Sequence, residues 1–375
     1  MNMNYVSMKP ALLLLCVVLF HVSCEQNNSD ILLVEIGGDL LNPEEVFVSD
    51  VAAEMKIVPL ETNDSCLIGR GRNFDWMKQG ILLNDVGLVK FDTTGHFLGN
   101  VFHFGQGPGE LPALNDYYVE DSLIYLTGLA KDLHIYSYGG RLLAQYSIPL
   151  FTHNGFAALG NGKFVTGTLE WGNGDKSGRL QFFDTLGIRK TLYKPYSTEG
   201  RLSESYPMGD EIKFFPHKDT VYMKELLCDT IYVVDAERDT ILPFLAYDFG
   251  SYKTRPEYRY NYSPEELFIK IPYTQFLGVS DEYVYLVVMM ADIHKKESID
   301  MLCIYNRKSK SSRLVRLSYS EKDIQVIKSK IGNNFDEKVS RYFVPVSLSQ
   351  DGKYLCTLLP QITDENPAIV AIRLK

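Results

Sequence analysis

The run Gly105-Gln106-Gly107-Pro108-Gly109-Glu110 has the spacing that most invites a chemical interpretation. Backbone N–H groups of closely spaced glycines can bind phosphate at the start of a helix. Here the spacing matches neither G-x-G-x-x-G nor a P-loop, no Lys follows, and Leu111-Pro112 does not begin a helix. We therefore expect a structural turn in which the Glu110 carboxylate folds back onto backbone N–H groups, formed by Gly105, Gly107, Pro108, Gly109 and Glu110.

Two other segments are rich in side chains that make binding contacts. Residues 252–262 contain four tyrosines and three basic residues, and Trp171 begins the turn sequence Trp171-Gly172-Asn173-Gly174-Asp175. Tyr and Arg are enriched at binding hot spots, and aromatic faces stack on sugars. The candidate partner-binding residues are therefore Tyr258, Arg259, Tyr260 and Trp171. The alternatives are that the first loop packs on its own insertion and that the indole covers the edge of a sheet.

Motifs for metal binding and nucleophilic catalysis are missing from the sequence. The seven histidines are scattered and form no HExxH, so we predict no zinc site, and no GxSxG elbow supports a serine hydrolase. No cofactor is predicted. Four cysteines lie far apart in apolar surroundings, where buried free thiols are expected, although an oxidising compartment would allow one or two disulfides. They are Cys66, Cys228, Cys303 and Cys356.

The N-terminus is typical of an export signal. Ala11–Phe20 is a ten-residue apolar run preceded by Lys9, which is too short to span a bilayer. The Val22-Ser23-Cys24 that follows resembles the lipobox of bacterial lipoproteins, in which the cysteine is acylated and becomes the first mature residue. We therefore predict a lipoprotein signal peptide over 1–23, lipidation at Cys24 and a linker over 24–30. The alternative is an ordinary secretory signal with an incidental cysteine.

The composition narrows the class of partner. The formal net charge of the 375-residue chain is −9, which argues against a nucleic-acid partner because a basic face supplies most of that affinity. The 24 Tyr and 20 Phe suit half-buried strands.

A short pattern recurs along the chain and predicts its fold. An apolar run ends in Asp or another polar residue and is followed by a turn and a second apolar run, first at Leu88–Asp92. The later copies are at 133–137, 180–184, 230–235, 301–306 and 369–372. Early copies lie 45, 47 and 51 residues apart, which suits four-stranded propeller blades. Later spacings of 71 and 67 contain helical insertions beginning near Ser263 and Ser320.

We therefore predict an all-β fold over 31–375: a six-bladed β-propeller with short helical insertions in the late blades. Because an open blade exposes strand edges, the ends of such a ring must be fastened. We expect the strand at 31–36 to pair in the last blade and close the circle.

Several of these segments resemble a known family, the Bacteroidetes-type lipoproteins with six-bladed β-propellers that are related to NHL-repeat proteins. The resemblance lies in Ile57–Thr62, Cys66–Gly69, Phe91-Asp92 with Gly95 and, above all, Phe104–Glu110. It implies a secreted or surface-anchored propeller, and it implies no settled activity.

The sequence thus predicts an exported, membrane-anchored lipoprotein, in the outer membrane on its periplasmic or surface face. Its expected role is that of a non-catalytic binding module for a protein, peptide or glycan at the cell envelope. The alternative is a metal-dependent hydrolase or lactonase with a divalent cation in the central channel. The ligands of such a site would come from different blades, so their spacing in the sequence cannot reveal it.

Overall fold

The computed structural model describes residues 31–36, 40–69, 73–85, 87–107, 110–128, 131–149, 155–167, 178–193, 212–255, 258, 266–267, 269, 271–292, 297–332, 341–361 and 365–375. The chain divides into two units, residues 1–32 and 33–375. Apart from Leu32, the elements given below belong to the second unit. The predicted signal peptide, Cys24 and the linker lie outside the described residues.

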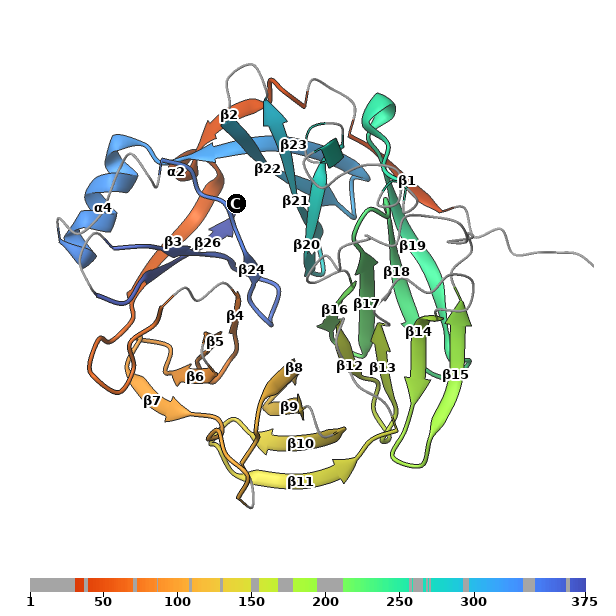
Figure 1. Ribbon diagram of the computed structural model, residues 1–375. Helices are drawn as coiled ribbons and strands as arrows, with labels where there is room; N and C mark the ends of the chain where they lie inside the picture. Colours follow the sequence, from red (N-terminus) through yellow and green to blue (C-terminus); the bar gives the residue numbers. More distant parts are fainter. Residues whose placement is uncertain are drawn as a thin grey trace, which may run out of the picture. The chain divides into compact units, whose positions relative to one another are not determined.

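The described strands form six blades around a common centre, as the sequence predicted (Figure 1). From the inner to the outer strand, blade I consists of β4 (Asn73–Trp76), β5 (Ile81–Asn84), β6 (Leu88–Phe91) and β7 (Phe97–Asn100). Blade II consists of β8 (Leu114–Glu120), β9 (Leu123–Gly128), β10 (Asp132–Ser137) and β11 (Leu142–Ser147). Blade III consists of β12 (Phe156–Ala158), β13 (Phe164–Gly167), β14 (Gly178–Phe183) and β15 (Ile188–Tyr193).

Blades IV to VI also take up strands from near the N-terminus. Blade IV consists of β16 (Ile212–His217), β17 (Thr220–Glu225), β18 (Thr230–Asp235) and β19 (Thr240–Asp248), with β1 (Leu32–Glu35) at its outer edge. Blade V consists of β20 (Tyr273–Val279), β21 (Tyr283–Asp292), β22 (Glu297–Asn306) and β23 (Ser311–Ser318), with β2 (Glu44–Phe47) at its outer edge. Blade VI consists of β24 (Ser347–Leu348), β25 (Leu355–Leu359) and β26 (Ala368–Leu374), with β3 (Ala52–Pro59) as its outer strand. Strands that follow one another along the chain within a blade pair antiparallel, whereas β2 is parallel to β23 in blade V.

The ring is closed by β3, so the prediction that residues 31–36 would close it is wrong. β3 is the outermost strand of blade VI and pairs antiparallel with β26 from Ala52 to Pro59. Residues 31–36 contain β1, which instead lies beside β19 at the outer edge of blade IV. β3 offers a longer edge than the four residues of β1, in which Leu33 is 57% exposed. The N-terminal segment therefore follows the outer edges of blades IV, V and VI in turn (Figure 1).

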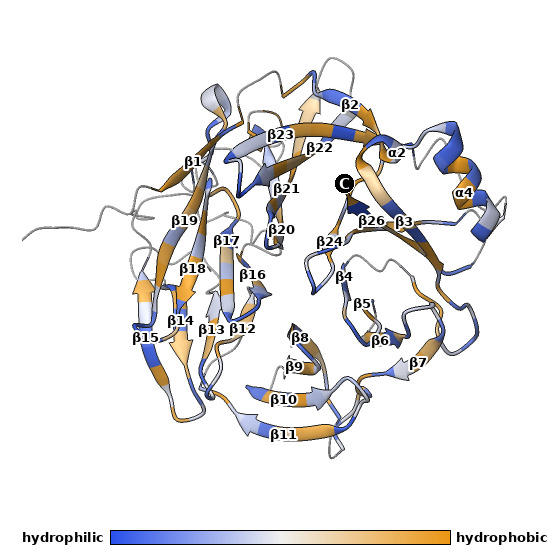
Figure 2. Ribbon diagram, turned by 180° about the vertical axis from the view of Figure 1, so that it is seen from behind, coloured by the Kyte–Doolittle hydropathy of each residue, from blue (hydrophilic) through white to orange (hydrophobic). Residues whose placement is uncertain are grey.

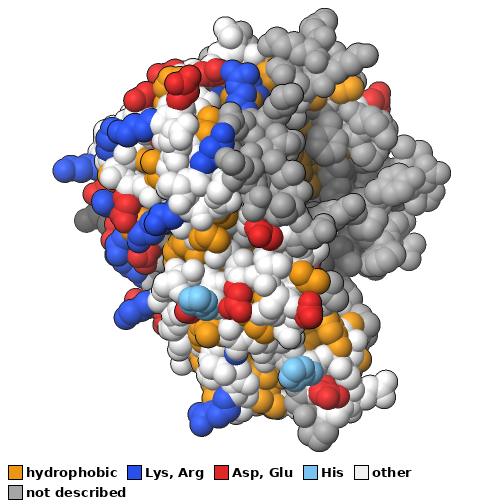
Figure 3. Space-filling model, turned by 90° about the vertical axis from the view of Figure 1, so that its left-hand side faces the viewer, with side chains coloured by type: hydrophobic (Ala, Val, Ile, Leu, Met, Phe, Trp, Pro, Cys, Tyr) orange, Lys and Arg blue, Asp and Glu red, His pale blue; other side chains and the backbone are white. Residues whose placement is uncertain are grey.

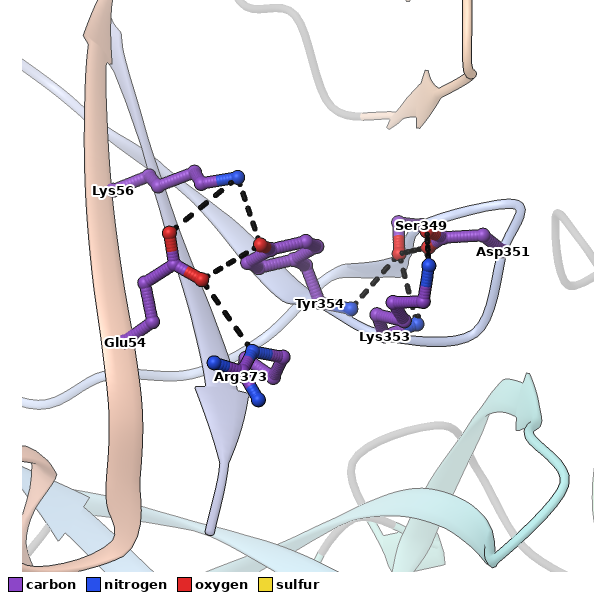
Figure 4. A network of polar contacts seen from close by, with 7 residues as sticks. All are labelled: Glu54, Lys56, Ser349, Asp351, Lys353, Tyr354 and Arg373. Atoms are coloured by element: carbon purple, nitrogen blue, oxygen red, sulfur yellow. Dashed lines mark hydrogen bonds and ion pairs between the residues drawn. The ribbon is translucent and has the colours of Figure 1, made fainter.

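Polar side chains reinforce the closure of blade VI (Figure 4). The Tyr354 hydroxyl donates to Glu54 Oε2 at 2.8 Å, and Lys56 Nζ donates to the Tyr354 oxygen at 2.7 Å. Arg373 Nε lies 3.4 Å from Glu54 Oε2. These contacts join β3 to the strands at the C-terminal end of the chain.

The recurring polar residue of the sequence pattern caps the turn between the third and fourth strands of a blade. Asp92 Oδ1 accepts hydrogen bonds from the N–H groups of Thr94 and His96. Asp184, Asp235 and Asn306 accept equivalent bonds from two backbone N–H groups each. Short Asp and Asn side chains can replace backbone acceptors in tight turns, which explains why the pattern recurs in blades I, III, IV and V.

Apolar residues fill the interfaces between neighbouring blades. Between blades II, III and IV, the rings of Phe156, Phe164 and Phe183 pack with centroids 5.4 to 6.3 Å apart. Outer strands such as β11 and β15 carry both hydrophobic and hydrophilic residues (Figure 2). The core therefore lies between the blades and towards the axis, which fixes the inner strands firmly.

Blade IV is also joined to both neighbours by buried polar contacts. Arg179 of β14 donates from Nε to Glu225 Oε2 of β17 at 2.8 Å, and its guanidinium lies over the Tyr232 ring. Lys224 Nζ donates to Thr274 Oγ1 of β20 at 2.8 Å. Buried charges are tolerated where hydrogen bonds of this kind satisfy them.

The predicted late helix at Ser320 is α4 (Glu321–Ile331), between β23 and β24. Ser320 and Asp323 form a capping box, and Gly332 follows the last turn. On this side of the molecule, positive and negative side chains are interspersed (Figure 3). The start of the other predicted helix, at Ser263, lies outside the described residues. No helix in the described part of the chain is long and apolar enough to cross a membrane.

Candidate functional site: the axial cavity

A cavity of about 240 Å³ lies on the axis of the ring. Residues from the inner strand of every blade line it, and the six strands β4, β8, β12, β16, β20 and β24 surround it (Figure 1). Ligand sites are commonly concave and built on rigid elements. This cavity is therefore the candidate functional site of the described residues.

Alternation along the inner strands places polar groups at the cavity. On β4, Phe74 is buried between blades, whereas its neighbours Asn73 and Asp75 are half-buried. On β16, Ile212 and Phe214 are buried in the same way and Lys213 is half-buried. Because successive side chains of a strand point to opposite faces, the strand supplies both core and cavity residues.

Asp75 is a cavity carboxylate whose surroundings shift its pKa. Burial raises the pKa of Asp75, while a hydrogen bond from the Tyr117 hydroxyl and the charge of Lys213 act in the opposite direction. These three side chains come from blades I, II and IV, and β16 lies across the channel from β4 (Figure 1). The charge of a carboxylate taken out of water is destabilised, and polar neighbours recover only part of that loss.

A bulge in β8 fixes a second carboxylate at the cavity. The pairing of β8 with β9 shifts register between Leu114 and Asp116, and Asn115 Nδ2 donates to the Gly128 carbonyl at 3.1 Å. Asp116 Oδ1 accepts from the Tyr117 N–H at 2.8 Å. Bulges re-aim side chains in this way next to functional sites.

The remaining wall combines amide and aromatic groups. Gln275 of β20 lines the cavity, and its Nε2 donates to the Val346 carbonyl at 3.3 Å. The lining ring of Phe215 is held by Phe276, with 4.8 Å between ring centroids. Trp76 packs with Phe74 on the other face of β4 and stacks on Tyr354 at 6.2 Å between centroids. The arrangement can donate and accept hydrogen bonds, pair with charge and pack on an apolar face.

No group of three or more His, Cys, Asp or Glu side chains with metal-binding geometry occurs in the part of the chain that the structure describes. The cavity carboxylates are therefore assigned no metal here. The hydrolase alternative has no ligand set among these residues and stays a prediction.

The glycine-rich run lies between β7 and β8. Glu110 Oε2 accepts from the Gly107 N–H at 2.8 Å, which is the fold-back expected from the sequence. A Cβ on Gly105 would clash with that oxygen, so a larger residue there would displace the carboxylate from this position. Pro108 and Gly109 lie outside the described residues. A purely structural role for the loop stays a prediction.

Of the candidate partner-binding residues, Tyr258 is described and half-buried. Its side chain packs against the cluster of Leu227, Leu267 and Ile271. For Tyr258, this packing agrees with the alternative interpretation, in which the loop packs on its own insertion. Arg259, Tyr260 and Trp171 lie outside the described residues, so a partner site there stays a prediction.

Cys66, Cys228, Cys303 and Cys356 are free thiols. Burial raises the pKa of Cys303 to about 12, so this thiol is not a reactive thiolate at neutral pH.

The cavity residues Asp75, Tyr117 and Lys213 are not among the site residues predicted from the sequence. The available signal was a polar residue between apolar ones in a short strand, as in Asn73-Phe74-Asp75-Trp76. That signal is shared by many half-exposed strands. Only closure of the ring brings residues of blades I, II and IV together.

The fold and the cavity define the class of protein: a six-bladed β-propeller with a polar axial cavity. The chain belongs to the family described as domain of unknown function DUF4934, whose model matches residues 33–367.

The solved structures agree with this fold. A crystal structure from Bacteroides fragilis NCTC 9343, described as a "putative exported protein", is 16% identical, with a TM-score of 0.61 over 92% of this chain and 99% of that one. At this identity the likeness shows the fold alone. The WD40 repeats of RRP9 are 10% identical over 86% of this chain and all of theirs, and their TM-score of 0.43 supports no argument. Nothing matches among proteins of curated function.

Proposed function

We propose that this protein is an exported, lipid-anchored binding module of the cell envelope whose ligand enters the axial cavity. The observation that carries the proposal is the cavity itself, lined by all six blades and holding the Asp75, Tyr117 and Lys213 side chains together. Polar groups on packed inner strands form a preorganised site, which lowers the entropic cost of binding.

Blocking the cavity tests this proposal. Asn73 lines the cavity, and Asn73→Trp should fill it. Leu186→Trp is the matched control, because Leu186 is 96% exposed in a turn of blade III. Thermal unfolding of the full chain in detergent, with panels of sugars, amino acids, peptides and carboxylates, identifies a ligand.

A ligand at a hundred times its Kd should raise the free energy of unfolding by about 2.7 kcal/mol. The increase should vanish in Asn73→Trp and persist in Leu186→Trp. Equal binding by Asn73→Trp and the natural protein would place the ligand elsewhere and contradict the proposal.

Two further measurements separate the module from its alternatives. We expect Cys24→Ser to move the protein from the membrane fraction to the soluble fraction, and unchanged partitioning would refute lipid anchoring at Cys24. Elemental mass spectrometry after dialysis should find no stoichiometric metal. One divalent ion per chain, together with conversion of the ligand, would favour the hydrolase.

A further inference from the structure

We infer that the axial cavity binds a neutral, polyhydroxylated ligand of monosaccharide size through Asp75 and Lys213. This inference rests on the proposed function and gives it a substrate class. Its basis is the volume of the cavity, the two signs of charge within it and its fixed aromatic rings.

The volume limits the ligand to a small molecule. Drug-sized ligands occupy cavities of roughly 300–1,000 Å³. The axial cavity, at about 240 Å³, is smaller than this range. A single sugar ring is in proportion to it, whereas an oligosaccharide or a folded peptide would reach it only with a terminal group.

The polar groups of the cavity have opposing requirements. An ionised Asp75 only accepts hydrogen bonds, Lys213 only donates them, and the Asn73 and Gln275 amides do both. An anion beside Lys213 would also meet the field of Asp75, and a cation beside Asp75 would meet that of Lys213, whose charge acts on Asp75 across the channel. Asp116 adds a second carboxylate to the lining, and its Oδ1 already accepts from the Tyr117 N–H. Hydroxyl groups both donate and accept, so a polyol suits every one of these partners without adding charge.

The aromatic rings supply the contact that a sugar ring needs besides hydrogen bonds. Phe215 lines the cavity on the same face of β16 as Lys213, and it is held by the Phe276 ring. Trp76 lies on the other face of β4, with Phe74, and packs on Tyr354 beside the cavity. The C–H faces of a sugar are apolar and bury surface against such rings. A rigid ring loses little conformational freedom on binding.

The desolvated carboxyl gives a reason for tight binding. Burial raises the pKa of Asp75 even though Tyr117 and Lys213 act on it, so the ionised form is under-solvated. Ligand hydroxyls would donate hydrogen bonds to this carboxylate. A hydrogen bond to a charged group contributes more binding free energy than one between neutral groups.

The test is calorimetric titration of the full chain in detergent with glucose, galactose, mannose and N-acetylglucosamine. Glucosamine, glucuronate and glutamate serve as charged probes of similar size. We expect one-to-one binding of at least one neutral sugar, and binding of its charged analogue that is weaker by about tenfold or more. Methyl glycosides distinguish a free sugar from the end of a glycan. A site for the end of a glycan must accept a substituent on the anomeric oxygen and should still bind the methyl glycoside, whereas a site for a free sugar should not.

Variants tie the binding to the named residues. Asp75→Asn and Lys213→Met should each weaken the neutral sugar by about tenfold or more, since each removes a charged hydrogen-bond partner. Glu54→Gln is the matched control, because Glu54 also lies beside a tyrosine and a lysine but in blade VI, outside the cavity lining. It should leave the sugar affinity unchanged.

Preference for a charged probe, or failure of every neutral sugar to bind at 10 mM, overturns the inference. So does unchanged sugar affinity in both Asp75→Asn and Lys213→Met. A charged ligand that Asn73→Trp excludes would overturn the sugar class while leaving the binding module standing. If no ligand of any class depends on the cavity, the proposed function fails as well.

Discussion

A carboxylate, a tyrosine hydroxyl and a lysine meet in two regions of this protein, with opposite effects on the carboxylate. In blade VI, the Glu54, Tyr354 and Lys56 side chains are partly exposed (Figure 4), and the hydrogen bond from Tyr354 lowers the pKa of Glu54. In the axial cavity, burial raises the pKa of Asp75 although Tyr117 and Lys213 act on it.

The comparison shows that access to water, more than the identity of the partners, decides what such a group does. Where water still solvates the charges, the network stabilises the ionised carboxylate and fastens two strands. Where less water reaches the carboxylate, the same residue types leave its ionised form under-solvated beside a cavity. The first region is therefore suited to stability and the second to binding.

Removal of the N-terminal strands should have the largest effect. A chain beginning at Leu60 lacks β3 and leaves the edge of β26 bare, including Ile369 and Val370, which are fully buried. We expect it to lose cooperative thermal unfolding, because an unfastened blade exposes strand edges and apolar core. A chain beginning at Ala52 keeps β3 and should still unfold cooperatively, at a lower Tm. Equal Tm values for the chain from Leu60 and the full chain would show that β3 does not close the ring.

Loss of one hydroxyl in blade VI should have a moderate effect. Tyr354→Phe removes the bond to Glu54 and the acceptor of Lys56, and we expect a loss of about 1 kcal/mol in denaturant unfolding, with cavity binding unchanged. Tyr247→Phe is the matched control, because that buried hydroxyl has no hydrogen-bond partner among the described residues. Its removal should be neutral or stabilising. A larger loss in Tyr247→Phe than in Tyr354→Phe would reverse this assignment.

The pH dependence of stability should separate the two carboxylates by sign. The folded pKa of Glu54 lies below its ordinary value of 4.5, so its contribution is present above that pH and is lost as the pH falls through the folded pKa. The folded pKa of Asp75 lies above its ordinary value of 3.8. The ionised Asp75 therefore lowers the free energy of unfolding: this effect is absent below pH 3.8, grows as the pH rises from 3.8 to the folded pKa, and is complete above it.

At pH 7, Glu54→Gln should therefore lower the free energy of unfolding, by less than about 1 kcal/mol for a partly exposed pair, and Asp75→Asn should raise it. Both differences should shrink towards pH 3. Thermal unfolding across this range measures them, and a shift of the same sign in both variants at pH 7 would contradict the comparison.

The repeat, and with it the blade, could be predicted from the order of residues. Asp92, Asp184, Asp235 and Asn306 cap local turns with their own side chains, and turns of this kind depend on a few neighbouring residues. The capping box of Ser320 and Asp323 is local in the same sense, and the helix begins where the sequence predicted. Local interactions of this kind are visible in the order of residues, so fold class, blade number and the late helix followed from it.

The tertiary structure alone decided how the ring closes and where its cavity lies. Both β1 and β3 have the apolar pattern of an edge strand. Which of them closes the ring depends on which strand each one reaches, and β1 lies beside β19 whereas β3 lies beside β26. Asp75 and Lys213 are 138 positions apart in the sequence and come from blades on opposite sides of the channel. Their meeting depends on the packing of all six blades around one axis, a long-range property that no short stretch of sequence encodes.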